Sequence, residues 1–123
     1  MSRTPRNLVA AGFVFLVVTA SASAQTPAKV DQGAALFASQ KCTMCHSIAG
    51  KGNPKGSLDG VAATHKSDEI RQWIVDPEAM RAKANATRTP AMKPLKLSRD
   101  QVDALVAYLS TLKTPKAMAD TER

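Results

Sequence analysis

Apolar residues recur at helical spacing in three parts of the chain, most clearly near its C-terminal end. The stripe there has residues at offsets of 0, 3, 4, 7 and 10 from its first member: Val102, Leu105, Val106, Leu109 and Leu112. Ser98 precedes the stripe and Gln101 follows three residues later, which is typical of a capping box. Because Pro115 limits the other end, the pattern predicts a helix from Ser98 to about Lys113.

The segment from Asp31 to about Lys41 predicts the first helix, because Asp31 can cap it and small and apolar residues follow. After it, Ser47–His65 has the composition of a loop, rich in glycine, lysine and asparagine. No strand of alternating β-branched residues is visible beyond residue 24. The chain is therefore predicted to be all-α.

The next helix is predicted to begin at Ser67, a capping residue followed by two acidic residues. Its apolar face has residues at helical spacing: Ile70, Trp73 and Ile74. It ends before Pro77, because the residue preceding a proline avoids the helical conformation. Ala79–Ala86 can form a short helix, whereas Thr87–Pro94 is predicted to be irregular because of its prolines.

The first 24 residues have the three parts of a secretory signal peptide. Arg3 and Arg6 are positive, Leu8–Ala20 is apolar, and Ala22–Ala24 supplies small residues for cleavage. Because the apolar run is shorter than the roughly 20 residues that span a bilayer, we expect cleavage after residue 24, with an uncleaved tether as the alternative. The expected location is the periplasm or another compartment outside the cytoplasm.

Cleavage leaves one domain, residues 25–123, with a core at about 31–113 and a mobile tail at 114–123. A chain of this size is near the lower limit at which an apolar core alone is sufficient. Few aromatic residues follow the signal segment: Phe37, Trp73 and Tyr108. A buried cofactor would supply the missing apolar bulk.

The run from Cys42 through Thr43 and Met44 to Cys45 and His46 carries the most specific chemistry. Two cysteines separated by two residues, with a histidine directly after them, form the attachment signature of a c-type haem. Residues i and i+3 share one face of a helical turn, so both thiols can reach the vinyl groups on one porphyrin edge. The sequence predicts one covalently bound haem c, with His46 as an axial iron ligand.

Other interpretations of Cys42 and Cys45 explain less. A disulfide between them would close a very short loop and stabilise little. A thioredoxin-like redox pair is expected beside a βαβ unit, which the chain lacks. A zinc site needs more ligands at the usual spacing than His46 and the distant His65 provide.

An iron bound by one histidine has a second axial position to fill, and a methionine is predicted there. A methionine ligand raises the reduction potential of the iron relative to a second histidine. Met44 lies inside the attachment turn and Met118 in the tail. Met92 is the preferred candidate, since the prolines on both sides stiffen the backbone that holds its thioether. Met80 is the alternative.

Two other side chains and a set of lysines have candidate roles. His65 is expected to face solvent, with a role as iron ligand or acid–base group as the alternative. Trp73 is expected near the core, where its indole N–H could donate to a haem propionate. Lysines flanking the haem segments predict a docking ring for acidic redox proteins: Lys41, Lys51, Lys55, Lys93 and Lys96. The net charge of +7, which falls to about +5 without the two arginines of the signal segment, fits such partners, whereas no basic run suggests nucleic acid.

Several stretches together resemble the class I monohaem cytochromes c, in particular small bacterial periplasmic ones. The resemblance covers about Asp31–Lys113 and is carried by Gly33–Phe37, Cys42–His46, Gly56–Gly60, Ile70–Ile74, Asp76–Pro77, Met92, Leu97–Ser98 and Leu105–Leu109. It implies a compact all-α fold of three to four helices around one haem. It also implies that Gly33 and Phe37 meet Tyr108 where the first and last helices cross, that Met92 is the sixth ligand, and that Trp73 lies near a propionate.

One position departs from the family pattern. The family often has a proline after the first glycine of the second stretch, and its carbonyl holds the other nitrogen of the axial histidine. Here that residue is Ser57, with Pro54 three residues earlier. Such an acceptor orients a ligating histidine. The sequence therefore leaves open which carbonyl orients His46.

These observations predict a monomeric electron carrier and not an enzyme. Two strong axial ligands leave no open coordination position on the iron, and haem enzymes need one. The alternatives are a haem enzyme or gas sensor with a labile sixth ligand, and a cytochrome subunit of a larger oxidoreductase.

Overall fold

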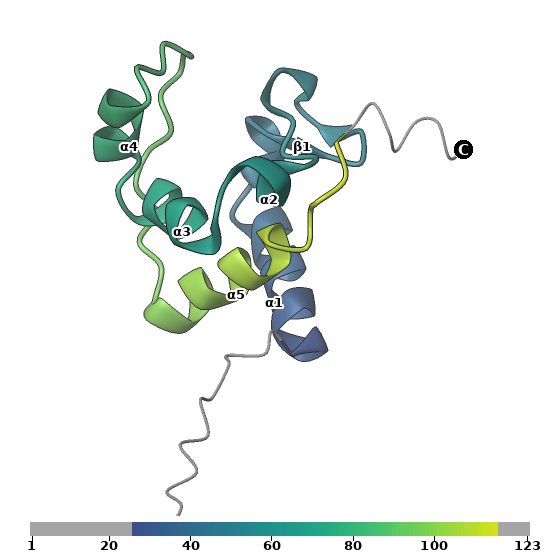
Figure 1. The fold of residues 1–123 in the computed structure, drawn as a ribbon. Coiled ribbons are helices and arrows are strands. Elements are labelled where there is room, and N and C mark those ends of the chain that lie inside the picture. Colours follow the sequence, from purple (N-terminus) through teal and green to yellow (C-terminus); the bar gives the residue numbers. More distant parts are fainter. Residues whose placement is uncertain (1–25, 116–123) are drawn as a thin grey trace, which may run out of the picture.

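The computed structural model describes residues 26–115, so the predicted signal peptide 1–24, Met118 and most of the predicted tail lie outside the described residues. The described part contains helices, 3₁₀ turns (η) and one small hairpin (Figure 1), in this order: α1 (Pro27–Ser39), η1 (Cys42–Met44), β1 (Ser47–Ile48), β2 (Lys51–Gly52), η2 (Pro54–Gly56), α2 (Val61–Thr64), α3 (Ser67–Val75), α4 (Pro77–Lys83) and α5 (Arg99–Leu109). The all-α prediction is confirmed. Within residues 26–115, no helix combines the length and the apolar character needed to cross a membrane.

Helices α1 and α5 cross in close contact, as the family resemblance implied. A Cβ atom on Gly33 of α1 would collide with the carbonyl of Ala104 and with Cβ of Tyr108, both on α5. One turn later, Phe37 packs edge-to-face on Tyr108, with ring centroids 6.0 Å apart and an interplanar angle of 63°. The predicted meeting of Gly33 and Phe37 with Tyr108 is confirmed.

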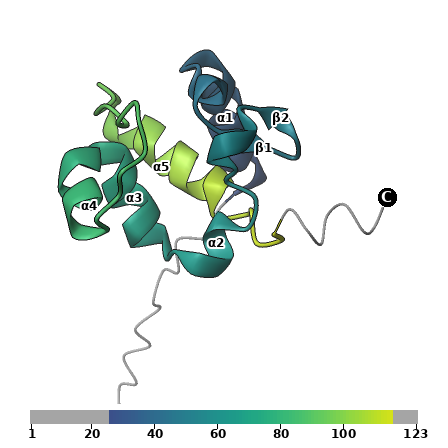
Figure 2. The same ribbon diagram turned by 90° about the horizontal axis from the view of Figure 1, so that it is seen from above.

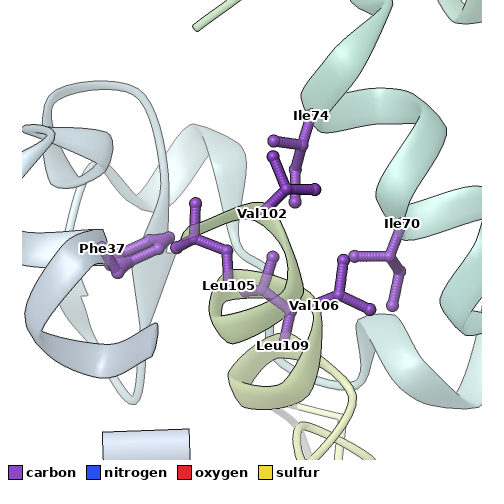
Figure 3. Close-up of a cluster of buried hydrophobic side chains, with 7 residues drawn as sticks. All are labelled: Phe37, Ile70, Ile74, Val102, Leu105, Val106 and Leu109. Atoms are coloured by element: carbon purple, nitrogen blue, oxygen red, sulfur yellow. The ribbon is translucent and has the colours of Figure 1, made fainter. Parts of the chain in front are cut away.

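A single cluster of buried apolar side chains joins α1, α3 and α5. Figure 3 shows its members, with the α3 side chains directed at α5: Phe37, Ile70, Ile74, Val102, Leu105, Val106 and Leu109. Burying each such side chain contributes on the order of 1.5–3 kcal/mol. The predicted apolar stripe is therefore the core face of α5, which holds the other helices in place around it.

The N-terminal helix differs from the prediction at both ends. It begins at Pro27 instead of Asp31, because a proline at the first helical position has a backbone already suited to the helix. It ends at Ser39, and Lys41 adopts a left-handed conformation with φ of 57°. This break separates the helix from Cys42, so the haem motif is not simply a continuation of the last helical turn.

The segment Ser47–His65, predicted to be a loop, contains the hairpin β1–β2 and the short helix α2. Ala49 and Gly50 both have positive φ, at 50° and 75°, which is the geometry of a two-residue hairpin turn. The Ala49 N–H also donates to a carboxylate oxygen of Asp59 at 2.8 Å. An alanine at the first turn position is unusual, which is why composition alone did not reveal the hairpin.

The other helix boundaries are close to the predicted ones. The capping box of Ser98 and Gln101 is confirmed. Helix α5 ends at Leu109, before the predicted end at about Lys113. The chain then turns, and the carbonyl of Leu112 accepts from the N–H of Ala62 at 3.0 Å. The residue that precedes α3 is Lys66. Ser67 is therefore not the cap, and its hydroxyl pairs with that of Ser110 at 3.1 Å.

Candidate functional site

Cys42 and Cys45 are brought together by the 3₁₀ turn η1 that follows α1. The backbone N–H groups of Cys45 and His46 both donate to the Cys42 carbonyl, at 3.1 and 2.9 Å. Residues i and i+3 eclipse in a 3₁₀ turn, a geometry that favours both thiols on the same side of it. Both cysteines are free; Cys42 is half-buried and Cys45 is exposed. Burial raises the pKa of the Cys42 thiol, and the neighbouring Cys45 raises it further.

His46 is held by a backbone carbonyl on the other side of the hairpin. Its Nδ1 atom lies 3.1 Å from the carbonyl oxygen of Gly56. Because a carbonyl only accepts, Nδ1 carries the proton and Nε2 keeps its lone pair for a metal. The acceptor that the sequence left open therefore belongs to Gly56, and Ser57 in place of a proline does not remove it.

The surroundings of His46 favour its neutral form. Burial lowers the pKa of His46, and this effect outweighs the carbonyl of Gly56, which raises it. The positive charge of Arg88 lowers the pKa further. A neutral imidazole is the form that binds a metal ion.

Asn53 joins the hairpin to residues 42–46, the haem-attachment turn. Its N–H lies 3.1 Å from the carbonyl oxygens of both Thr43 and His46, and its side-chain amide donates to the Met44 carbonyl at 3.2 Å. Its side-chain oxygen accepts from the N–H of Lys55 at 3.0 Å. This role of Asn53 was not predicted from the sequence. The signal available was an asparagine directly before a proline, which favours a local side-chain turn.

The candidate methionines occupy different environments. Met44 is 70% exposed on η1, and Met80 is 5% exposed within α4. Met92 is partly buried in the irregular segment between α4 and α5. It lines a hollow of about 490 Å³ together with Arg81 and Ala86, whereas Met80 does not contribute to it. Met80 thus fills the protein interior, while Met92 sits on a segment that no regular structure fixes.

A family model for cytochrome c matches residues 30–113 of this chain. The chain belongs to the cytochrome c family. Comparisons with curated proteins and with solved structures gave no match. Membership confirms the resemblance to the class I monohaem cytochromes c and implies covalently bound haem c and a role in electron transfer.

The residues of this cytochrome c fit a covalently bound haem. Two free cysteines, at the first residue of η1 and at its C-cap, are what two thioether bonds require. The tautomer of His46, fixed by Gly56, presents Nε2 as a ligand. A Cβ on Gly56 would collide with the carbonyl oxygen of Cys45. A glycine is therefore needed where residue 56 approaches the backbone that follows η1.

Trp73 and His65 lie on or beside α3. Trp73 is partly buried on α3, but it is not among the partly buried side chains that pack against the core cluster. Nδ1 of His65 lies 3.3 Å from a carboxylate oxygen of Glu69, and both side chains are 40% exposed. The contacts of His65 are thus with α3, and it borders a surface hollow that also includes residues after α5.

The candidate docking lysines of this cytochrome c are all exposed and fall into two groups. Lys41, Lys51 and Lys55 lie around η1, the hairpin and η2, and Lys93 and Lys96 lie on the segment before α5. Figure 2 shows these two parts of the chain on opposite sides of α5. These lysines therefore come from two separate parts of the chain.

Proposed function

We propose that this protein carries single electrons between other proteins by means of one haem c. Cys42 and Cys45 bind the haem covalently, and His46 and Met92 are the axial ligands. The observation that carries the proposal is the hydrogen bond from His46 to Gly56, which leaves Nε2 available next to two free thiols. When bound, the haem supplies an iron that changes between ferric and ferrous states.

Met92 is proposed as the sixth ligand because its segment leaves its thioether available. Met80 is 5% exposed on a helix and acts as a gap-filling core residue. Met92 is only partly buried and belongs to a segment without helix or strand. With two protein ligands, no position is left for a substrate or a gas, which favours an electron carrier over a haem enzyme or sensor.

Trp73 is proposed to donate its indole N–H to a haem propionate. The side chain is partly buried, and its indole N–H is a hydrogen-bond donor without an acceptor function. Within residues 26–115, no buried side-chain nitrogen or oxygen lacks a partner, so the indole N–H, which makes no hydrogen bond to the protein, is open to solvent and can donate to an added carboxylate. A propionate carboxylate would satisfy this donor and fix the orientation of the ring.

The partners are proposed to be redox proteins with acidic faces, met by a monomer of this protein. The exposed lysines around η1 and before α5 support this, because such charges steer transient encounters more than they tighten binding. Redox encounters typically bury little surface. Electron-transfer rates with an acidic partner should therefore fall as salt is added, whereas a fixed subunit of a larger oxidoreductase would co-purify at constant stoichiometry.

Export is proposed from the arrangement of residues 1–24, with removal of that segment. Haem attachment to both cysteines also requires that they stay reduced until the thioether bonds form. Sequencing the N-terminus of the protein purified from the periplasm should give Gln25 as the first residue. A product that begins at Met1 and stays with the membrane would instead support the uncleaved tether.

The ligand set is tested by optical spectra of the full chain, produced together with haem-attachment machinery. The wild-type ferric protein should show a methionine–iron charge-transfer band. Met92→Ala should abolish this band, and Met80→Ala should keep it. Rapid carbon monoxide binding to the wild-type ferrous protein, with no such band in the ferric state, would overturn the carrier proposal in favour of an open haem site.

A further inference from the structure

Arg88 connects the segment after α4 to the turn that carries His46. Its guanidinium donates to the carbonyl oxygen of Cys45, the residue directly before His46. The same guanidinium lies against Gly56, because a Cβ there would collide with both of its terminal nitrogens. Arg88 therefore contacts two backbone groups that position His46. One is the carbonyl of Cys45, which directly precedes His46 in the chain, and the other is Gly56, whose carbonyl accepts from Nδ1 of His46.

This contact spans parts of the fold that are otherwise apart. The segment 84–98, which contains Met92, lies on one side of α5, and η1 with the hairpin lies on the other (Figure 2). Within residues 26–115, the bond from Arg88 to Cys45 is the one hydrogen bond that joins segment 84–98 to residues 40–60. Arg88 also precedes Met92 by only four residues.

We propose that Arg88 is a positioning residue that ties the segment of Met92 to the turn of His46 and so restrains the methionine from leaving the iron. This role rests on the proposed ligation by His46 and Met92. The segment has no helix or strand, so few backbone bonds restrain it, and a side-chain bond at residue 88 restricts the path on which Met92 can move away. Its loss should raise the fraction of molecules in which the methionine has left the iron.

The size of the effect follows from a single hydrogen bond at an exposed position. Such a bond changes an equilibrium by roughly 2- to 10-fold. Arg88 is exposed, so solvent competes for the Cys45 carbonyl and limits the effect to that range. We therefore expect a graded weakening of the methionine–iron bond and not its complete loss.

The test measures how readily added imidazole replaces the methionine in the ferric holoprotein. Arg88→Ala should bind imidazole roughly 2- to 10-fold more tightly than wild type, since imidazole enters when the methionine leaves. Arg88→Lys keeps one charged donor and should lie between the two. Lys83→Ala is the matched control, because it removes an exposed positive charge at the end of α4 that does not bond to residues 40–60.

The outcomes separate this role from the proposed function. If the wild-type ferric protein has no methionine–iron band for imidazole to displace, the proposed ligation itself is wrong. If wild type has the band and Arg88→Ala binds imidazole with wild-type affinity, the positioning role of Arg88 is wrong. Should Arg88→Ala fail to attach haem, Arg88→Gln and Arg88→Lys provide the same comparison, and wild-type affinity in both overturns the role.

Discussion

The Nδ1 atom of His46 lies 3.1 Å from the carbonyl oxygen of Gly56, ten residues further along the chain. This bond fixes the tautomer and the ring orientation of the imidazole before any metal is bound. It is possible because the hairpin β1–β2 and the turn η2 bring Gly56 back to the thiol-bearing turn. Local backbone geometry around residues 47–56 therefore determines how the proposed ligand is presented.

Replacing Gly56 by alanine should disturb this presentation. The added Cβ would collide with the carbonyl of Cys45 and the guanidinium of Arg88. If either group moves away, the hydrogen bond between them is weakened or lost. We expect a loss of stability on the order of 1–3 kcal/mol, with less haem attached per chain. Chemical denaturation and the haem-to-protein ratio measure both effects. Lys55→Ala, at the exposed neighbouring position, should change neither.

Gly33→Ala should weaken the crossing of α1 and α5. The new methyl group would collide with the Ala104 carbonyl and with Cβ of Tyr108 on the facing helix. The helices would have to separate, at a cost on the order of 1–3 kcal/mol in the free energy of unfolding. Thermal and chemical denaturation measure the change. Ala35→Ser, at an exposed position of the same helix, should stay within about 0.5 kcal/mol of wild type.

Helices and their core faces followed from the sequence because their signals are local. The stripe from Val102 to Leu109 and the box of Ser98 and Gln101 both appear in α5 as predicted. The haem-attachment turn was also predictable, since Cys42 and Cys45 carry a spacing with few other uses.

The contacts that position His46 could not be predicted, because they join residues that are distant in sequence or depend on backbone conformation. Asn53 bonds to three carbonyls of the attachment turn only after the Ala49–Gly50 turn has folded the chain back. Arg88 reaches Cys45 across the fold from an irregular segment with no periodicity to interpret. Sequence patterns describe the elements, whereas these bonds depend on how the elements are placed.

Met80→Ala should reveal a structural role that is independent of the iron. Met80 is 5% exposed, so truncation removes buried apolar atoms and leaves a cavity. The free energy of unfolding should fall by about 2–5 kcal/mol, as for other buried methionines. The methionine–iron band of the folded protein should persist at low denaturant. Its loss together with wild-type stability would instead identify Met80 as the ligand.

Asp103→Asn should give a stability change that depends on pH. The guanidinium of Arg71 on α3 pairs with the carboxylate of Asp103 on α5, and this hydrogen bond holds the pKa of Asp103 below its usual range. A carboxyl whose pKa is lower in the folded state stabilises the protein above its unfolded pKa of about 3.9. That contribution disappears as the pH falls through the lower, folded value.

The Asp103→Asn variant should therefore be less stable than wild type at neutral pH and equally stable in acid. Denaturation at both pH values measures this difference, at low salt, where the pair is least screened. Asp31→Asn, which removes an exposed carboxylate on α1, is the matched control. A difference between Asp103→Asn and wild type that is the same at neutral and acid pH would show that the carboxylate charge does not tie α3 to α5.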